Sequence, residues 1–137
     1  IWMMMYDGKF FRLNRKTDNF ESLINHFPNS IEARIESPLF TSNSSIWAII
    51  QNAGLLEIET DSLSNRMTIR FHPLENIEVH QLYEDSLSTI WATTSKGVRV
   101  LKSDTLSIKQ YEKKEVALAI TQLDGCIYWG TADGNLI

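Results

Sequence analysis

Residues 90–97 read Ile-Trp-Ala-Thr-Thr-Ser-Lys-Gly, and the sequence repeats this pattern imperfectly three more times. Each copy has an apolar residue, an aromatic residue, strand-forming residues and a short polar turn that ends in glycine, after which the chain becomes apolar again. The other copies lie at residues 1–8, 46–54 and 127–134. Two strands joined by a tight turn that closes on glycine are typical of a β-hairpin. The sequence therefore predicts four related hairpins.

The aromatic residue of each copy marks the repeat length. These residues are Trp2, Trp47, Trp91 and Tyr128, at intervals of 45, 44 and 37 residues. Repeats of about 40–50 residues suit the blades of a β-propeller, whereas leucine-rich and ankyrin repeats are shorter, about 20–33 residues. HEAT and armadillo repeats have a similar length, but they need long segments of helical apolar periodicity, of which this chain has few. We predict an all-β fold, a β-propeller of four-stranded antiparallel blades.

The third repeat is the clearest, with strands expected at residues 77–83, 89–94, 98–101 and 108–111. In the second repeat we expect the first strand at residues 31–35, followed by a polar connector over residues 37–45. The sequence begins and ends inside copies of the pattern, so we expect a fragment of about three blades that packs against the remaining blades of a longer protein. The expected blade parts are residues 1–27, 31–72, 77–111 and 116–137.

The recurring aromatic residue has a structural explanation. Blades stacked around an axis bury both faces of each sheet, and a large ring at one position of every blade would fill the wedge between neighbours. We therefore interpret Trp2, Trp47, Trp91 and Tyr128 as structural wedge residues.

Composition excludes several classes of function. A net charge of −4 and an isoelectric point near 5.3 argue against a binder of nucleic-acid backbones, which usually carries a basic stripe. No apolar run approaches the roughly 20 residues that cross a bilayer, so we expect no membrane contact from this segment. The single cysteine, Cys126, cannot form an internal disulfide, and its place at the start of a strand favours a buried structural thiol.

No catalytic, metal or cofactor site is predicted. His26, His72 and His80 are scattered, without the spacing of a metal site. Glu84 and Asp85 form an acid–base pair on paper, but their place between two strands favours capping of a turn. The glycines of the last repeat are not followed by a helix, as a phosphate-binding loop would be.

If a ligand binds, propeller geometry favours one rim of the central channel. That rim would be built from the connector between the second and third strands of each blade and from the connector between blades. The main candidates are Tyr6, Asn52, Lys96 and Asp133. Further candidates on the same connectors are Asp7, Asn29, Gln51, Glu75, Asn76 and Ser95.

Residues 79–101 resemble the two-component regulator propeller repeat. The matching features are an inner strand, Glu84-Asp85, a turn, Ile90-Trp91, a small-residue strand that ends in threonine, and a Gly-Val step into an apolar strand. Residues 126–137 match the central part, and the copies at 1–13 and 46–58 are looser because Ala53 adds a residue before its glycine and Glu-Asp is missing before Ile46.

The resemblance implies an extracytoplasmic sensor. In that family the repeats build seven-bladed propellers, commonly two in tandem, within hybrid two-component systems. A membrane helix, a histidine kinase, a receiver and a DNA-binding domain usually follow, and gut bacteria use many of these proteins to detect glycan fragments.

We therefore expect a non-enzymatic, periplasmic part of a sensor histidine kinase of the inner membrane. Its expected partners are an oligosaccharide or other small ligand and, in the parent protein, a second copy in a homodimer. Two alternatives remain at this point: a propeller enzyme of the streptogramin-lyase type, and a propeller that serves only as a protein-binding platform.

Overall fold

The computed structural model describes residues 1–5, 7–23, 34–61, 66–101, 109–111 and 115–137. Their regular structure consists of antiparallel strands in four small sheets, each a meander in which consecutive strands are neighbours. The predicted all-β fold class is confirmed. The strands of the first and second sheets are β1 (Trp2–Met4), β2 (Phe10–Asn14) and β3 (Asn19–Ser22), then β4 (Ile35–Phe40), β5 (Ser45–Ile50), β6 (Gly54–Thr60) and β7 (Met67–Pro73). The strands of the third and fourth sheets are β8 (Val79–Glu84), β9 (Ile90–Thr94), β10 (Gly97–Leu101) and β11 (Lys109–Tyr111), then β12 (Ala117–Leu123) and β13 (Cys126–Thr131).

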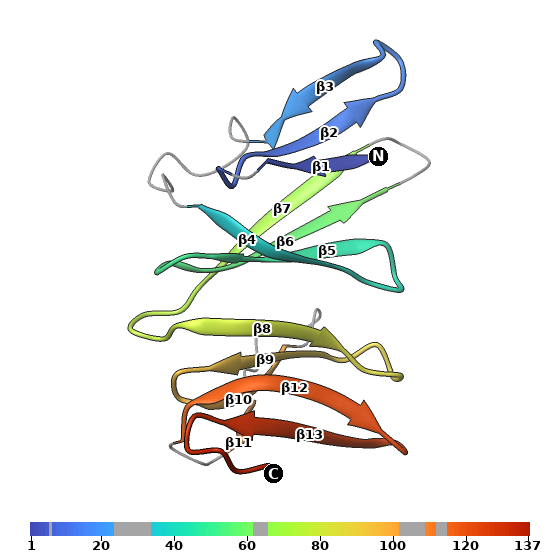
Figure 1. Ribbon diagram of the computed structural model, residues 1–137. Coiled ribbons are helices and arrows are strands. Elements are labelled where there is room, and N and C mark those ends of the chain that lie inside the picture. Colours follow the sequence, from blue (N-terminus) through green and yellow to red (C-terminus); the bar gives the residue numbers. More distant parts are fainter. Residues whose placement is uncertain (6, 24–33, 62–65, 102–108, 112–114) are drawn as a thin grey trace.

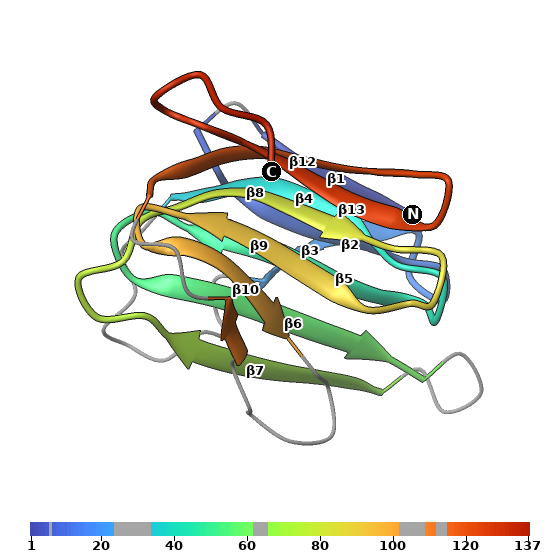
Figure 2. The same cartoon turned by 90° about the horizontal axis from the view of Figure 1, so that it is seen from below.

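The four sheets are stacked in chain order (Figure 1). The first strands of the last three sheets, β4, β8 and β12, lie on the same side of the stack, with β7 on the opposite side (Figure 2). Strand β8 contacts both β4 and β12. The first strand of each of these sheets is therefore the inner strand, and the stack has the arrangement of neighbouring propeller blades.

Strand β5 shows why its sequence is apolar on both faces. All six of its residues are buried, because the second sheet is covered on both sides. Ile46, Ala48 and Ile50 belong to an apolar cluster with the first sheet. Trp47 and Ile49 point the other way, into a cluster with the third sheet. A strand buried on both faces reads as a continuous apolar run rather than an alternating one.

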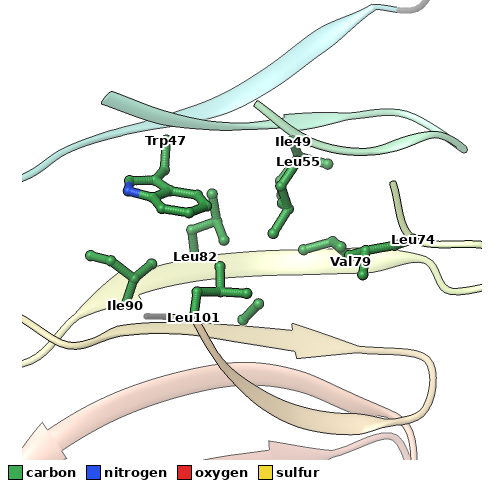
Figure 3. Close-up of a cluster of buried hydrophobic side chains, with 9 residues drawn as sticks. Trp47, Ile49, Leu55, Leu74, Val79, Leu82, Ile90 and Leu101 are labelled. Atoms are coloured by element: carbon green, nitrogen blue, oxygen red, sulfur yellow. The ribbon is translucent and has the colours of Figure 1, made fainter. Parts of the chain in front are cut away.

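The cluster between the second and third sheets is drawn in Figure 3. Trp47 and Leu55 approach it from the second sheet, and Leu82, Ile90 and Leu101 from the third. A smaller cluster joins the third and fourth sheets. It contains Val98, Ala117 and Ile120, with Tyr83, Trp91, Ile127 and Trp129 packed against it.

The prediction for the start of the second blade was wrong in one respect. Strand β4 runs from Ile35 to Phe40, through part of the segment predicted to be a polar connector. Its register with β5 shifts between Glu36 and Leu39, and Ser37 has a φ of 47°. Pro38 therefore lies at a bulge, one of the positions where a strand tolerates proline. Residues 31–33, predicted to begin this strand, lie outside the described residues.

Cys126 also departs from prediction. Its side chain is exposed rather than buried. It is the first residue of β13 and pairs with Leu123 directly after the two-residue turn of Asp124 and Gly125. The tip of this hairpin is not covered by the neighbouring sheet, so a residue beside the tip is exposed even though it belongs to a strand. The sequence pattern does not show which strand ends are covered.

Candidate functional site

The turns that follow the second strand of the second, third and fourth sheets lie along one edge of the stack. In each sheet the turn is tied to the residue just before the inner strand by a backbone hydrogen bond. Gln51 N–H donates to the Arg34 carbonyl (3.2 Å), Ser95 N–H to that of Glu78 (2.9 Å), and Ala132 N–H to that of Val116 (2.9 Å). These turns lie on the left in Figure 1, together with the turn that follows β1. We call this edge of the stack the turn rim.

Three of the four main candidates lie on the turn rim. Asn52, Lys96 and Asp133 are exposed and belong to the second, third and fourth sheets respectively. The fourth candidate, Tyr6, lies outside the described residues, as does Asn29. The structure thus places polar side chains from three successive sheets along one rim, as the connector argument predicts.

The extra residue in the second sheet changes the shape of its turn. Ala53 lengthens the loop to three residues, and Asn52 takes a left-handed conformation with a φ of 59°. Asparagine tolerates this conformation better than most side chains. Leu74 N–H donates to the Ala53 carbonyl (3.1 Å), so the connector that carries Glu75 and Asn76 is held beside this turn.

Asp7 and Lys9 add a local ion pair in the turn that follows β1. Lys9 Nζ lies 2.7 Å from Asp7 Oδ2, and Lys9 N–H donates to Asp7 Oδ1 (3.2 Å). The side-chain hydrogen bond from Lys9 holds the pKa of Asp7 below its ordinary value. Both side chains are exposed, so the pair orders the turn weakly and leaves both charges open to solvent.

A polar hollow lies on the opposite rim of the second sheet. Its volume is about 300 Å³, and the sequence analysis did not identify it. Its lining residues are Asn43, Ser44, Ser45, Glu59, Thr60, Asp61, Arg66 and Thr68. All of these side chains are polar, whereas small-molecule sites are usually lined mostly by apolar and aromatic residues. The hollow therefore has the character of a hydrated surface depression.

A buried carboxylate lies on the face of the second sheet that meets the third. The side chain of Glu57 is 2% exposed, and its Oε2 lies 3.0 Å from His72 Nε2 and 3.5 Å from Arg70 Nη1. The ring of His72 stacks on Trp47, with centroids 5.1 Å apart and an interplanar angle of 16°. Strand register explains the cluster, because Glu57 pairs with both Trp47 and Arg70.

This cluster has the residues of an acid–base pair without the access that a substrate would need. Glu57 and Trp47 are sealed between two sheets, and the exposed Arg70 lies 2.9 Å from Glu59. That hydrogen bond raises the pKa of Arg70. Glu57 is hydrogen-bonded to His72 and lies within ion-pair distance of Arg70, so the buried carboxyl group has partners and the cluster is structural. The sequence showed no sign of it, because Glu57 is 13 positions from Arg70 and 15 from His72.

The four recurring aromatic residues occupy equivalent strands: β1, β5, β9 and β13. Trp2 stacks on Phe10 (5.4 Å between ring centroids) and packs against the cluster between the first two sheets. Trp47 lies in the next cluster, and Trp91 packs against the cluster between the third and fourth sheets. Tyr128 is partly exposed on β13.

The Glu-Asp pair before the third hairpin does two different jobs. Asp85 Oδ1 accepts hydrogen bonds from the N–H groups of Leu87 and Thr89, and its Oδ2 accepts one from Trp91 Nε1, all between 2.8 and 2.9 Å. Burial acts to raise the pKa of Asp85, but these hydrogen bonds outweigh it and hold that pKa below the ordinary value. The capping role is confirmed for Asp85. Glu84 instead accepts hydrogen bonds from Ser42 of the second sheet.

The described residues contain no group of three or more His, Cys, Asp or Glu side chains placed to hold a metal ion. Within the same part of the chain, no helix has the length and apolarity of a membrane-crossing segment.

Stacked meanders with converging inner strands define the class of this protein: it is built from blades of the β-propeller type. No family model matches the sequence, and no curated protein is significantly similar to it. Solved structures are similar to the chain in fold. One is the extracellular domain of the hybrid two-component system BT4673 from B. thetaiotaomicron, with a TM-score of 0.70 and 16% identity over 98% of this chain and 18% of that one.

Two further structures are similar. A second structure of the BT4673 extracellular domain, described as a one-component system, has a TM-score of 0.65 and 15% identity over 98% of this chain and 20% of that one. The extracellular domain of the hybrid two-component system BT3049 from the same organism has a TM-score of 0.63 and 18% identity over 95% of this chain and 17% of that one. This chain therefore spans about a fifth of the length of these domains and shares their fold, in agreement with the resemblance to the propeller repeat of two-component regulators.

Proposed function

We propose that this chain is part of the extracellular sensor domain of a hybrid two-component system and contributes blades to its propeller. The observation that carries the proposal is the structural similarity to such domains over 98% of the chain, joined to the recurring Ile-aromatic hairpins and to the Glu84-Asp85 pair of the third repeat. The proposal places the domain in the periplasm, with the rest of the propeller, a membrane anchor and a histidine kinase in the same protein. The blades themselves carry out no reaction.

The turn rim is the proposed ligand-facing surface. Asn52, Lys96 and Asp133 provide an amide, a cation and a carboxylate on three successive sheets, and each turn is held by a backbone hydrogen bond to its own sheet. Such groups bind the hydroxyls of an oligosaccharide without a deep apolar pocket. A rigid sheet under each polar tip also limits the ordering that the ligand must impose on the protein.

Signal transfer in the proposed sensor requires two states with different ligand affinity. We propose that the parent protein is a homodimer and that the ligand favours one arrangement of its two sensor domains. A ligand with equal affinity for both arrangements would transmit nothing.

The test is a binding screen on the complete sensor domain. A panel of oligosaccharides from plant, host and microbial glycans is added, and the melting temperature is measured. A ligand at a hundred times its Kd stabilises by about 2.7 kcal/mol, which gives a shift of about 1–2 °C in a domain about five times the length of this chain. The substitution Lys96→Ala should reduce this shift, and Arg15→Ala, which removes an exposed cation from a turn outside the turn rim, should not.

Three outcomes would each contradict part of the proposal. If Lys96→Ala and Arg15→Ala change the ligand-induced shift in melting temperature equally, the turn rim is not the binding surface. No shift with any member of the panel would reject carbohydrate sensing. A parent gene without an apolar segment of about 20 residues followed by a kinase domain would reject the hybrid two-component role.

A further inference from the structure

Two turns at the rim opposite the turn rim have the same geometry. They join the first and second strands of the second and third sheets and span residues 41–45 and 85–89. In both, the first residue donates its N–H to the fifth (3.0 Å), and the fourth donates to the first (3.0–3.1 Å). The fourth residue is a serine in the left-handed region, with φ of 66° at Ser44 and 59° at Ser88. The second residue is also a serine in both, and we call these two segments the docking turns.

The first docking turn binds the next sheet through Ser42. Its N–H donates to both carboxylate oxygens of Glu84, at 3.1 Å to Oε1 and 2.8 Å to Oε2. Its hydroxyl also donates to Glu84 Oε1 and lies 2.8 Å from the hydroxyl of Ser88. Glu84 is the last residue of the inner strand β8, so these bonds join the second sheet to the third.

The second docking turn makes the same contact one sheet further on. Ser86 N–H donates to Gln122 Oε1 (2.9 Å), and Gln122 Nε2 donates to the Ser86 hydroxyl (3.0 Å). Glu84 pairs with Ile90, and Gln122 with Ile127, the first residue of the matching Ile-aromatic pair. Glu84 and Gln122 therefore occupy the same position at the end of successive inner strands.

We propose that this contact is a recognition element between blades. A docking turn presents a serine N–H and hydroxyl, and its partner is a blade whose inner strand ends in a carboxylate or carboxamide. The apolar clusters between the sheets are non-directional and do not select a register by themselves. Hydrogen bonds are directional, so the docking turn fixes how each sheet sits on the next.

The element is specific, because two comparable positions among the described residues lack its parts. Phe40 holds the position of Glu84 in the second sheet, pairing with Ile46, and its side chain cannot accept a hydrogen bond. The turn between β12 and β13 has Asp124 and Gly125, both with positive φ, and contains no serine. The element thus marks two particular interfaces: second sheet to third, and third sheet to fourth.

The inference is tested by amide hydrogen exchange measured by NMR on the whole chain. The variant Glu84→Leu should speed exchange of the Ser42 amide about tenfold, the effect of losing one ordinary hydrogen bond, and leave the Ser86 amide unchanged. Gln122→Leu should do the reverse. Glu84→Gln, which installs the side chain found at the next interface, should preserve protection of the Ser42 amide.

The amide of Ala48, within the central strand β5, reports whether each variant remains folded. Should a leucine variant unfold, Glu84→Gln compared with Glu84→Ala still decides, because the inference predicts a protected Ser42 amide in the first and faster exchange of that amide in the second. A Ser42 amide that exchanges without protection in the unsubstituted chain would overturn the inference. Equal acceleration of the Ser42 and Ser86 amides by either leucine variant would overturn it too.

Discussion

Trp47→Ala is the sharpest test of how the stack is held together. The side chain is 3% exposed and lies between the second and third sheets, against Leu82 and Ile90 and in a stack with the ring of His72 (Figure 3). A buried aromatic residue removes roughly 150–250 Å² from water. At about 25 cal/mol per Å² this contributes about 4–6 kcal/mol, of which the remaining methyl group keeps about 1 kcal/mol. We expect a loss of about 3–5 kcal/mol in the free energy of unfolding.

The loss is measured by urea unfolding followed by circular dichroism. With a denaturant slope of about 2 kcal/mol per molar, the midpoint should fall by about 2 M with the slope unchanged. Phe20→Ala is the matched control, since this aromatic residue is 46% exposed on β3 and should cost less than about 1 kcal/mol. A loss below 1 kcal/mol for Trp47→Ala, or one equal to that of Phe20→Ala, would refute the role of Trp47 in joining the sheets.

Two further predictions concern turns. The pKa of Asp85 is lowered in the folded chain, so its stabilising effect is present above the unfolded carboxyl value of about 3.9 and lost as the pH falls through the folded value. The difference in unfolding free energy between the unsubstituted chain and Asp85→Asn should therefore be constant from pH 5 to 7 and shrink below about pH 4. A difference that grows as the pH falls would contradict this. Gly54→Ala should cost more than about 2 kcal/mol, because its φ is +143° and a Cβ there would overlap the carbonyl oxygen of His72. Gly130→Ala is the control, because a Cβ there meets nothing within 4 Å and stability should change by less than about 0.5 kcal/mol. Both variants are measured by thermal melting, and similar losses of stability would contradict the close approach of backbone at Gly54.

The separation of the two rims gives the proposed sensor a simple design. One rim carries exposed polar tips that differ between sheets, and the other carries the serine contacts that join neighbouring sheets. Residues on the turn rim can therefore change without disturbing the contacts that order the stack. This is the division between scaffold and variable connector that binding proteins commonly show.

The sequence supported predictions wherever a pattern repeats. The spacing of Trp2, Trp47 and Trp91 predicted sheets of one kind, and the hairpins formed where a turn closes on glycine. Local chemistry also predicted the capping role of Asp85, because a side chain beside its own turn needs no distant partner. The polar tips Asn52, Lys96 and Asp133 could be placed on one rim, since alternating strand direction brings every second connector to the same end.

Predictions failed where a single residue broke the pattern. Pro38 suggested a connector, yet a bulge accommodates it within β4, and pairing with the well-formed β5 outweighs its local cost. Cys126 was predicted to be buried from its place in a strand, but the edge of the stack leaves it exposed. Both errors arise because the identity of a residue does not show what packs against it.

The repeat and the all-β class could be predicted from the amino-acid sequence alone, because hairpin formation and strand periodicity depend on residues close together in the chain. The contact of Glu57 with His72, and that of Ser42 with Glu84, 42 positions away, could be seen only in the folded chain. These contacts depend on strand register and on how one sheet lies against the next. Register and stacking depend on packing and on hydrogen bonds between residues far apart in the sequence, so no short stretch of sequence contains them.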